Sequence, residues 1–144
     1  MHSTRPAGVS ERPFANRLAW EVLSDICASK TWRYVRFELA CEPGLEVHHG
    51  TLQFQSLIAA LVRYAAARAG GGRVLVTCAH QAGRLRIAVV DEGIGADRAA
   101  QTAALRAIAE ELGLQGDALE ITTRAGEGST IQASWPDLRA SLFR

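Results

Sequence analysis

The sequence lacks several features that mark specialised classes of protein. Its 16 Lys and Arg residues nearly balance 15 Asp and Glu, and no stretch gathers the basic ones, which argues against a nucleic-acid or anionic-membrane surface. The three cysteines are far apart and form no CxxC motif, so they predict small core residues in a reducing compartment rather than disulfides or a zinc site. No apolar run has the length of a signal peptide or a membrane span, and we therefore expect a cytoplasmic protein.

The composition that remains is ordinary for a globular domain. Hydrophobic residues make up 48% of the chain and charged residues 22%, and 144 residues are enough for one domain with a buried core. The first residues are polar, include two prolines and show no periodicity. We expect a flexible leader at 1–13 and a single domain over 14–144.

Hydrophobic periodicity predicts the order of the elements. Apolar residues three or four positions apart predict helices at 15–29, 51–69 and 98–112. Alternation predicts a strand at 35–41 and two hairpins, one from 73–80 and 84–91, the other from 118–124 and 129–135. Helices that alternate with hairpins favour an α+β two-layer sandwich, in which a mixed or antiparallel sheet carries its helices on one face.

Residues 89–97 read VVDEGIGAD, where an apolar strand ends on a carboxylate and two glycines follow at alternate positions. A carboxylate fixed at a strand end can accept a hydrogen bond from the exocyclic amine of adenine, and Asp91 is placed to do so. Gly93 and Gly95 lack the Cβ atoms that would keep a flat ligand away from the backbone. The stretch predicts either the floor of a purine site or a plain glycine-rich turn.

The order of these elements, together with three motifs, resembles the ATP-binding domain of sensor histidine kinases, a family that extends to gyrase, heat-shock chaperones and mismatch-repair ATPases. DEGIG at 91–95 is similar to the DxGxG turn of that family, and GEGSTIQASWP at 126–136 is similar to its closing strand. LIAALVRYAAA at 57–67 lies where the family has a long helix with a basic and an aromatic residue, here Arg63 and Tyr64. The resemblance covers about Leu18 to Pro136 and implies these nucleotide-binding residues: Asp91, Gly93, Gly95, Gly128 and Ser129. It also implies that the hydroxyl of Ser129 holds the adenine ring, directly or through water.

The sequence departs from the family at the phosphate end of the site. Alignment on Arg63 and Tyr64 puts Ala60 where the family has a magnesium-binding asparagine, and the only asparagine in the chain is Asn16. A methyl group cannot ligate magnesium, which requires oxygen ligands. No glycine lies between Gly95 and Gly113, so the chain lacks the second glycine-rich segment whose amides cradle the phosphates. The four histidines also lie on no helix that resembles the family's phosphoacceptor helix (His2, His48, His49 and His80).

Resemblance and departures together imply a degenerate ATP-binding domain of two-component signal transduction that acts as a binding or regulatory module. It would bind ATP or ADP weakly or not at all, with doubtful use of magnesium and with neither catalytic nor metal-ligating residues. The implied partners are a response regulator or a histidine-bearing dimerisation domain, without contact to nucleic acid or membrane. Two alternatives stay open: an active kinase that phosphorylates a histidine in trans, and an anti-sigma-like protein that grips a partner.

Overall fold

The computed structural model describes residues 14–47, 50–69, 72–81, 84–92, 98–114, 119–124 and 128–136. Its elements alternate along the chain: α1 (Ala15–Cys27), the 3-10 helix η1 (Lys30–Trp32), β1 (Arg36–Cys41), α2 (Thr51–Ala69), β2 (Arg73–Gln81), β3 (Arg84–Asp91), α3 (Arg98–Glu111), β4 (Leu119–Arg124) and β5 (Gly128–Pro136). Every helix and strand that periodicity predicts is present, with ends within two residues of the expected ones. The predicted leader at 1–13 lies outside the described residues.

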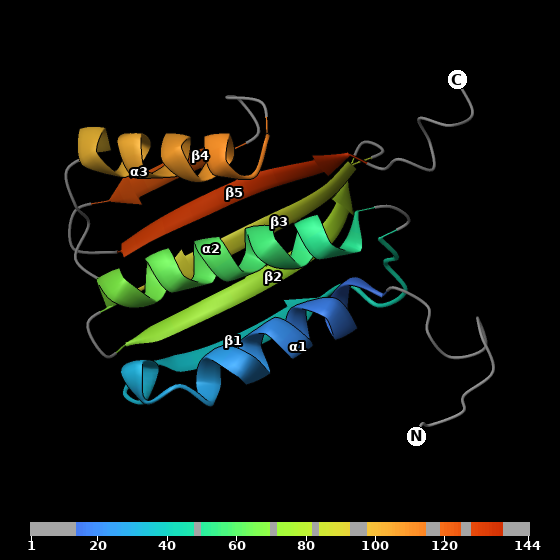
Figure 1. Cartoon of the computed structure of the whole chain (residues 1–144), viewed down its shortest axis with the longest axis horizontal. Coiled ribbons are helices and arrows are strands. Elements are labelled where there is room, and N and C mark those ends of the chain that lie inside the picture. Colours follow the sequence, from blue (N-terminus) through green and yellow to red (C-terminus); the bar gives the residue numbers. More distant parts are fainter. Residues whose placement is uncertain are drawn as a thin grey trace.

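The five strands form one mixed sheet in the order β1-β2-β3-β5-β4. β1 and β2 are parallel, and α2 is the crossover that returns the chain to the end where β1 began. All the other neighbouring strands are antiparallel. The order brings β5 next to β3, so the start of the last strand meets the end of the third (Figure 1).

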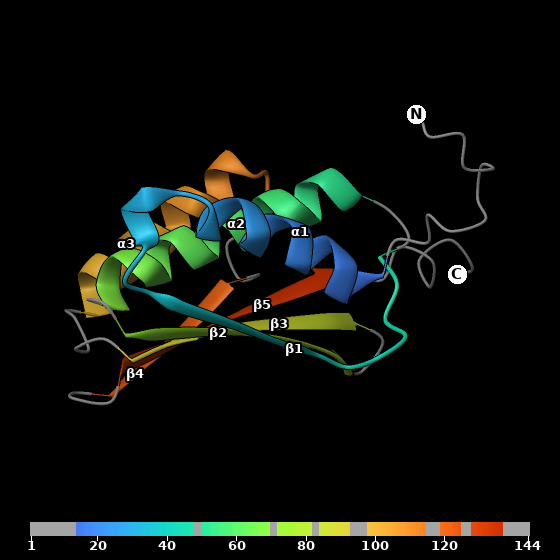
Figure 2. The same ribbon diagram turned by 90° about the horizontal axis from the view of Figure 1, so that it is seen from below.

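The three α-helices lie on one face of the sheet (Figure 2). α2 runs across the middle of the sheet between α1 and α3, which flank it on either side (Figure 1). α1 packs on β1 and α2, and α3 packs on β4. This arrangement confirms the α+β two-layer sandwich that the sequence predicts.

The core lies between the two layers. On β3, every second residue from Leu85 to Asp91 is buried on the helix-covered face, as expected for a strand with one face packed. α2 supplies the largest share of the opposing side chains, including Phe54, Leu57, Ile58, Leu61 and Val62, each 0% exposed. The cysteines are not all core residues, and this corrects the prediction: Cys78 is buried and Cys41 is half-buried, but Cys27 is exposed at the end of α1.

None of the described helices combines the length and the apolar character that crossing a bilayer requires.

Candidate functional site

Three polar side chains are buried among the described residues, and they gather at one end of the sheet. Asp91 is 1% exposed, Gln101 0% and Ser129 3%. Asp91 is the last residue of β3, Ser129 is the second residue of β5, and Gln101 lies in the first turn of α3. Because buried polar groups are costly unless they interact, a cluster of three inside an apolar core is a candidate site.

The strand register brings Asp91 and Ser129 together. The two residues are direct partners across the antiparallel β3–β5 pair. Opposite residues of such a pair hold their Cβ atoms about 5 Å apart and point their side chains to the same face. Asp91 continues the inward row of Ile87 and Val89, so its carboxylate and the Ser129 hydroxyl both point towards the helix layer.

α3 completes the cluster through Gln101. The Nε2 atom of Gln101 donates a hydrogen bond to the Oγ atom of Ser129 at 3.1 Å, and both side chains are buried. Asp91 takes part in further interactions, and its Oδ2 atom is buried without a hydrogen-bond partner among the described residues. The cluster therefore sets a carboxyl group beside a hydroxyl whose oxygen accepts from an amide.

Gly128 makes this geometry possible in a way the sequence did not predict. Its φ is +84°, a left-handed conformation that side chains disfavour. A Cβ at this position would overlap the carbonyl oxygen of Asp91 and lie 3.0 Å from its carbonyl carbon. Gly128 thus lets the start of β5 approach the backbone at the end of β3. The close packing of these two strands is the reason that the position requires glycine.

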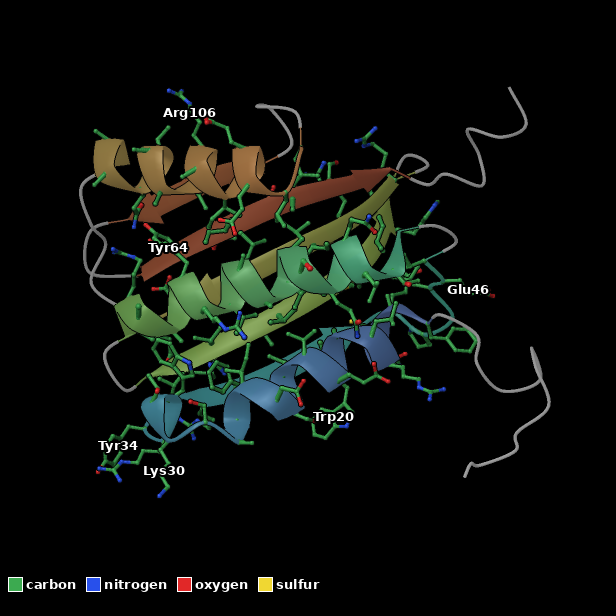
Figure 3. The ribbon with its side chains drawn as sticks, in the orientation of Figure 1. Trp20, Lys30, Tyr34, Glu46, Tyr64 and Arg106 are labelled. Atoms are coloured by element: carbon green, nitrogen blue, oxygen red, sulfur yellow. The ribbon has the colours of Figure 1, made fainter. Side chains whose placement is uncertain are left out.

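The resemblance places a magnesium ligand on α2 at position 60, where this chain has alanine. Figure 3 shows Tyr64 on the side of α2 that faces α3. Ala60 is one turn earlier, and residues four apart share a helix face, so Ala60 lies on that side too. At the position of the family's magnesium ligand α2 therefore presents only the methyl group of Ala60, which cannot ligate a magnesium ion.

No protein-family model matches the chain, and a search of curated proteins finds no match. Solved structures do match. Full-length ShkA in complex with AMPPNP gives a TM-score of 0.72 at 18% identity, over 87% of this chain and 30% of that one. The catalytic domain of the histidine kinase ThkA gives a TM-score of 0.68 at 16% identity, over 85% of this chain and 91% of that one. The mycobacterial sensor histidine kinase MprB gives a TM-score of 0.62 at 16% identity, over 83% of this chain and 94% of that one.

The chain has the fold of histidine kinase catalytic domains. It covers less than a third of the ShkA chain and 91% of the ThkA domain, so the likeness extends over about one domain of those proteins. At these identities the likeness concerns the fold alone, and the site has to be argued from the residues of this chain.

Within this histidine-kinase fold, Gln101 is the site residue that the motifs did not reveal. A lone glutamine in the Ala-rich helix AAQTAALRAIAEE reads as a solvated side chain. The signal was its position, because Gln101, Leu105 and Ala109 are four residues apart and form the buried stripe of α3. A polar residue on a buried stripe needs a partner, and Ser129 is that partner.

Two of the predicted binding residues, Gly93 and Gly95, lie outside the described residues. Just before them, Glu92 is exposed and bound to Arg73: its Oε1 accepts from the Arg73 backbone N–H at 3.2 Å, and its Oε2 lies 3.4 Å from Nη2. The same guanidinium reaches Glu38 on β1 at 3.3 Å, so these charges link three neighbouring strands. Pairs this exposed contribute little stability.

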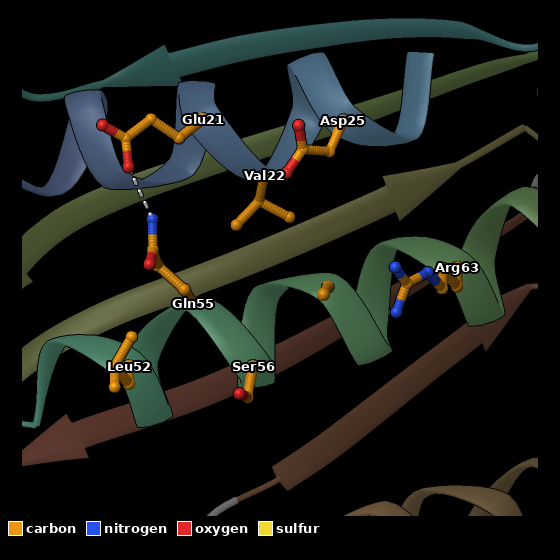
Figure 4. Close-up of a pocket in the computed structure, with 8 residues that line it drawn as sticks. Glu21, Val22, Asp25, Leu52, Gln55, Ser56 and Arg63 are labelled. Carbon is orange, nitrogen blue, oxygen red and sulfur yellow. Dashed lines mark hydrogen bonds between the residues drawn. The ribbon is translucent and has the colours of Figure 1, made fainter. Parts of the chain in front are cut away.

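A surface groove of about 470 Å³ lies elsewhere on the histidine-kinase fold, between α1 and α2 (Figure 4). Gln55 joins its two walls by donating to Glu21 Oε1 at 3.0 Å and to the carbonyl oxygen of Leu18 at 3.1 Å. Asp25 and Arg63 also line it. The groove lies on the α1 side of α2, away from Tyr64 and α3, so it is separate from the buried polar cluster.

Proposed function

We propose that this chain is a histidine-kinase-type ATP-binding domain of two-component signal transduction that recognises adenine but has lost the magnesium and phosphate elements, and that it acts as a binding or regulatory module. The observation that carries the proposal is the buried, cross-strand pair of Asp91 and Ser129 on this fold. The ATP or ADP it takes would be bound mainly through the base.

The pair suits the edge of an adenine ring. An ionised aspartate only accepts hydrogen bonds, which matches the exocyclic amine. A serine hydroxyl can donate as well as accept, so Ser129, whose oxygen accepts from Gln101, can match a ring nitrogen as a donor. Adenine offers its amine as a donor beside a ring nitrogen as an acceptor, and the two opposite residues offer the complementary pair, with Asp91 as acceptor and Ser129 as donor. In this proposal Gly93 and Gly95 form the floor under the base, and Gly128 allows Ser129 to reach it.

The phosphate end supports the loss of catalysis. Ala60 supplies no ligand for magnesium, and residues 92–97 are all that connects β3 to α3. A link this short, without a glycine after Gly95, offers little backbone to wrap a triphosphate. The domain therefore has the groups that read a base and lacks those that position a γ-phosphate, which favours a regulatory partner of a response regulator or of a histidine-bearing dimerisation domain over a kinase.

Calorimetric titration with ATP, ADP and adenosine, each with and without magnesium, tests the proposal. We expect weak binding of all three, with dissociation constants within a few-fold of one another and no effect of magnesium. No binding of any of them would remove the adenine site and leave partner binding as the function. Tight, magnesium-dependent binding of ATP would show an active phosphate site and refute the degenerate assignment.

A further inference from the structure

The fold brings together two of the three cysteines, which lie far apart in the sequence. Cys41 is the last residue of β1, Cys78 lies on β2, and they are direct partners in the parallel register of these strands. The backbone N–H of Glu42 donates to the carbonyl oxygen of Cys78 at 2.9 Å, which holds the two strands together at this point. β1 is the edge strand of the sheet, as Figure 1 shows.

Both thiols lie on the helix-covered face. Cys78 continues the buried row of Val74 and Val76, and Cys41 packs against the core together with Leu39. Neighbouring strands are about 4.8 Å apart. Disulfides span Cα separations of about 4.4–6.8 Å and Cβ separations of about 3.5–4.5 Å. The strand spacing lies within the Cα range, so the bond needs only a small approach of the two Cβ atoms, which start on the same face.

The two thiols differ in a way that suits them to different steps of oxidation. Cys41 is half-buried and Cys78 buried. The hydrogen bond from the Cys78 thiol lowers the pKa of Cys41 against the opposing effect of burial, because it stabilises the thiolate. The same hydrogen bond with Cys41 and its own burial raise the pKa of Cys78. Cys41 is thus the nucleophile that a small oxidant reaches, and Cys78 is the neighbour that resolves the product.

We propose that Cys41 and Cys78 form an oxidisable dithiol, a modification site that hydrogen peroxide converts reversibly to a disulfide between β1 and β2. The Cys41 thiolate attacks one peroxide oxygen, the O–O bond breaks, and the products after protonation are a sulfenic acid on Cys41 and water. The Cys78 sulfur then attacks the Cys41 sulfur, the S–O bond breaks, the S–S bond forms, and the Cys78 proton and the hydroxyl leave as a second water. Each disulfide consumes one peroxide, which takes up the two electrons of the two thiols. A thiol reductant restores them.

The disulfide would link the edge strand β1 covalently to β2. It closes the chain over residues 42–77, a loop that includes the whole of α2, and the gain in stability from a cross-link rises with the loop it closes. It lies away from the buried polar cluster, because Asp91 pairs with Val74 at one end of β2 and Cys78 pairs with Ile87 further along. The inference therefore stands independently of nucleotide binding.

Peptide mapping of the native chain tests the proposal. Reduced, desalted protein is treated with hydrogen peroxide, alkylated with N-ethylmaleimide and digested with trypsin, which places the cysteines on the separate peptides 18–30, 37–63 and 74–84. We expect 37–63 and 74–84 to be joined, two hydrogen atoms lighter than their sum, while Cys27 is alkylated. The oxidised chain should unfold several degrees higher than the reduced one, and dithiothreitol should reverse both changes.

Two comparisons make the test specific to the fold. Cys27→Ser removes the exposed thiol and should leave the cross-link unchanged, whereas Cys41→Ser should leave Cys78 alkylated. Protein oxidised in urea should no longer form the Cys41–Cys78 disulfide in preference to the other pairings, because only the native strand register holds these two cysteines together. Wild-type chain that stays fully alkylated, that forms sulfinic acid on Cys41 without a cross-link, or that links Cys27 as readily would overturn the proposal.

Discussion

Gly128 offers the sharpest test of how the end of β3 and the start of β5 are held together. Alanine at this position has to adopt a φ of +84°, which costs a non-glycine residue about 1–2 kcal/mol. Its Cβ would also overlap the carbonyl oxygen of Asp91 and come within 3.1 Å of the Glu92 Cα. These are backbone atoms of a paired strand, so they cannot rotate out of the way as a flexible side chain can.

The chain contains matched controls for the conformational part. Gly44 has a φ of +81° and Gly113 one of +72°, and a Cβ on either would meet nothing within 4 Å. Alanine there carries the strain of the left-handed conformation, offset by about 0.4–1 kcal/mol from the smaller entropy of the unfolded chain, so we expect a net loss of about 1 kcal/mol. Gly128→Ala carries the same strain and must in addition shift β5 away from β3.

A shift of this kind weakens the first hydrogen bonds of the β3–β5 ladder, each contributing about 1 kcal/mol. We therefore expect Gly128→Ala to lose about 3 kcal/mol of unfolding free energy, a large part of the roughly 5–15 kcal/mol typical of a domain. Urea denaturation followed by circular dichroism measures all three variants on one scale. If Gly128→Ala costs no more than Gly113→Ala, the β5 strand relieves the overlap at no cost, and the close approach is not what requires glycine.

Three further predictions concern the site. Asp91→Asn should weaken the binding of ATP, ADP and adenosine by the same factor, about ten- to a hundredfold, because a hydrogen bond to a charged acceptor contributes about 1.5–3 kcal/mol at the base. If calorimetry shows a loss of affinity for ATP alone, Asp91 lies at the phosphates instead. Gln101→Glu turns the partner of Ser129 from a donor into an acceptor, so the ratio of the affinity for adenosine to that for inosine should fall. Gln101→Met should instead lower both affinities together. If the ratio does not change in Gln101→Glu, Gln101 has no part in recognising the base. The purified chain should transfer no radiolabel from γ-labelled ATP to itself or to an added histidine-bearing dimerisation helix, because Ala60 leaves magnesium without its ligand; steady labelling of either would show that another residue supplies it.

Local patterns carried the prediction of the fold. Helical spacing in α2 and strict alternation in β3 are properties of neighbouring residues, so the bounds of these elements follow from the sequence to within two positions. The order of helices and hairpins also predicted the two layers, since each amphipathic element has one face to bury. The motif resemblance picked out Asp91 and Ser129, but their roles remain predictions until a nucleotide is titrated.

The tertiary structure decided which distant residues meet. No local pattern sets the register between β3 and β5, yet that register puts Asp91 opposite Ser129 and forces glycine at 128. The parallel register of β1 and β2 likewise sets Cys41 beside Cys78, where spacing along the chain predicts only small core residues and no disulfide. The physical reason is that strand order and register are chosen by the packing of the whole helix layer on the sheet, which sums contacts between residues far apart in the sequence. Composition and periodicity determine the elements and the face each one buries; only packing determines the neighbours found on that face.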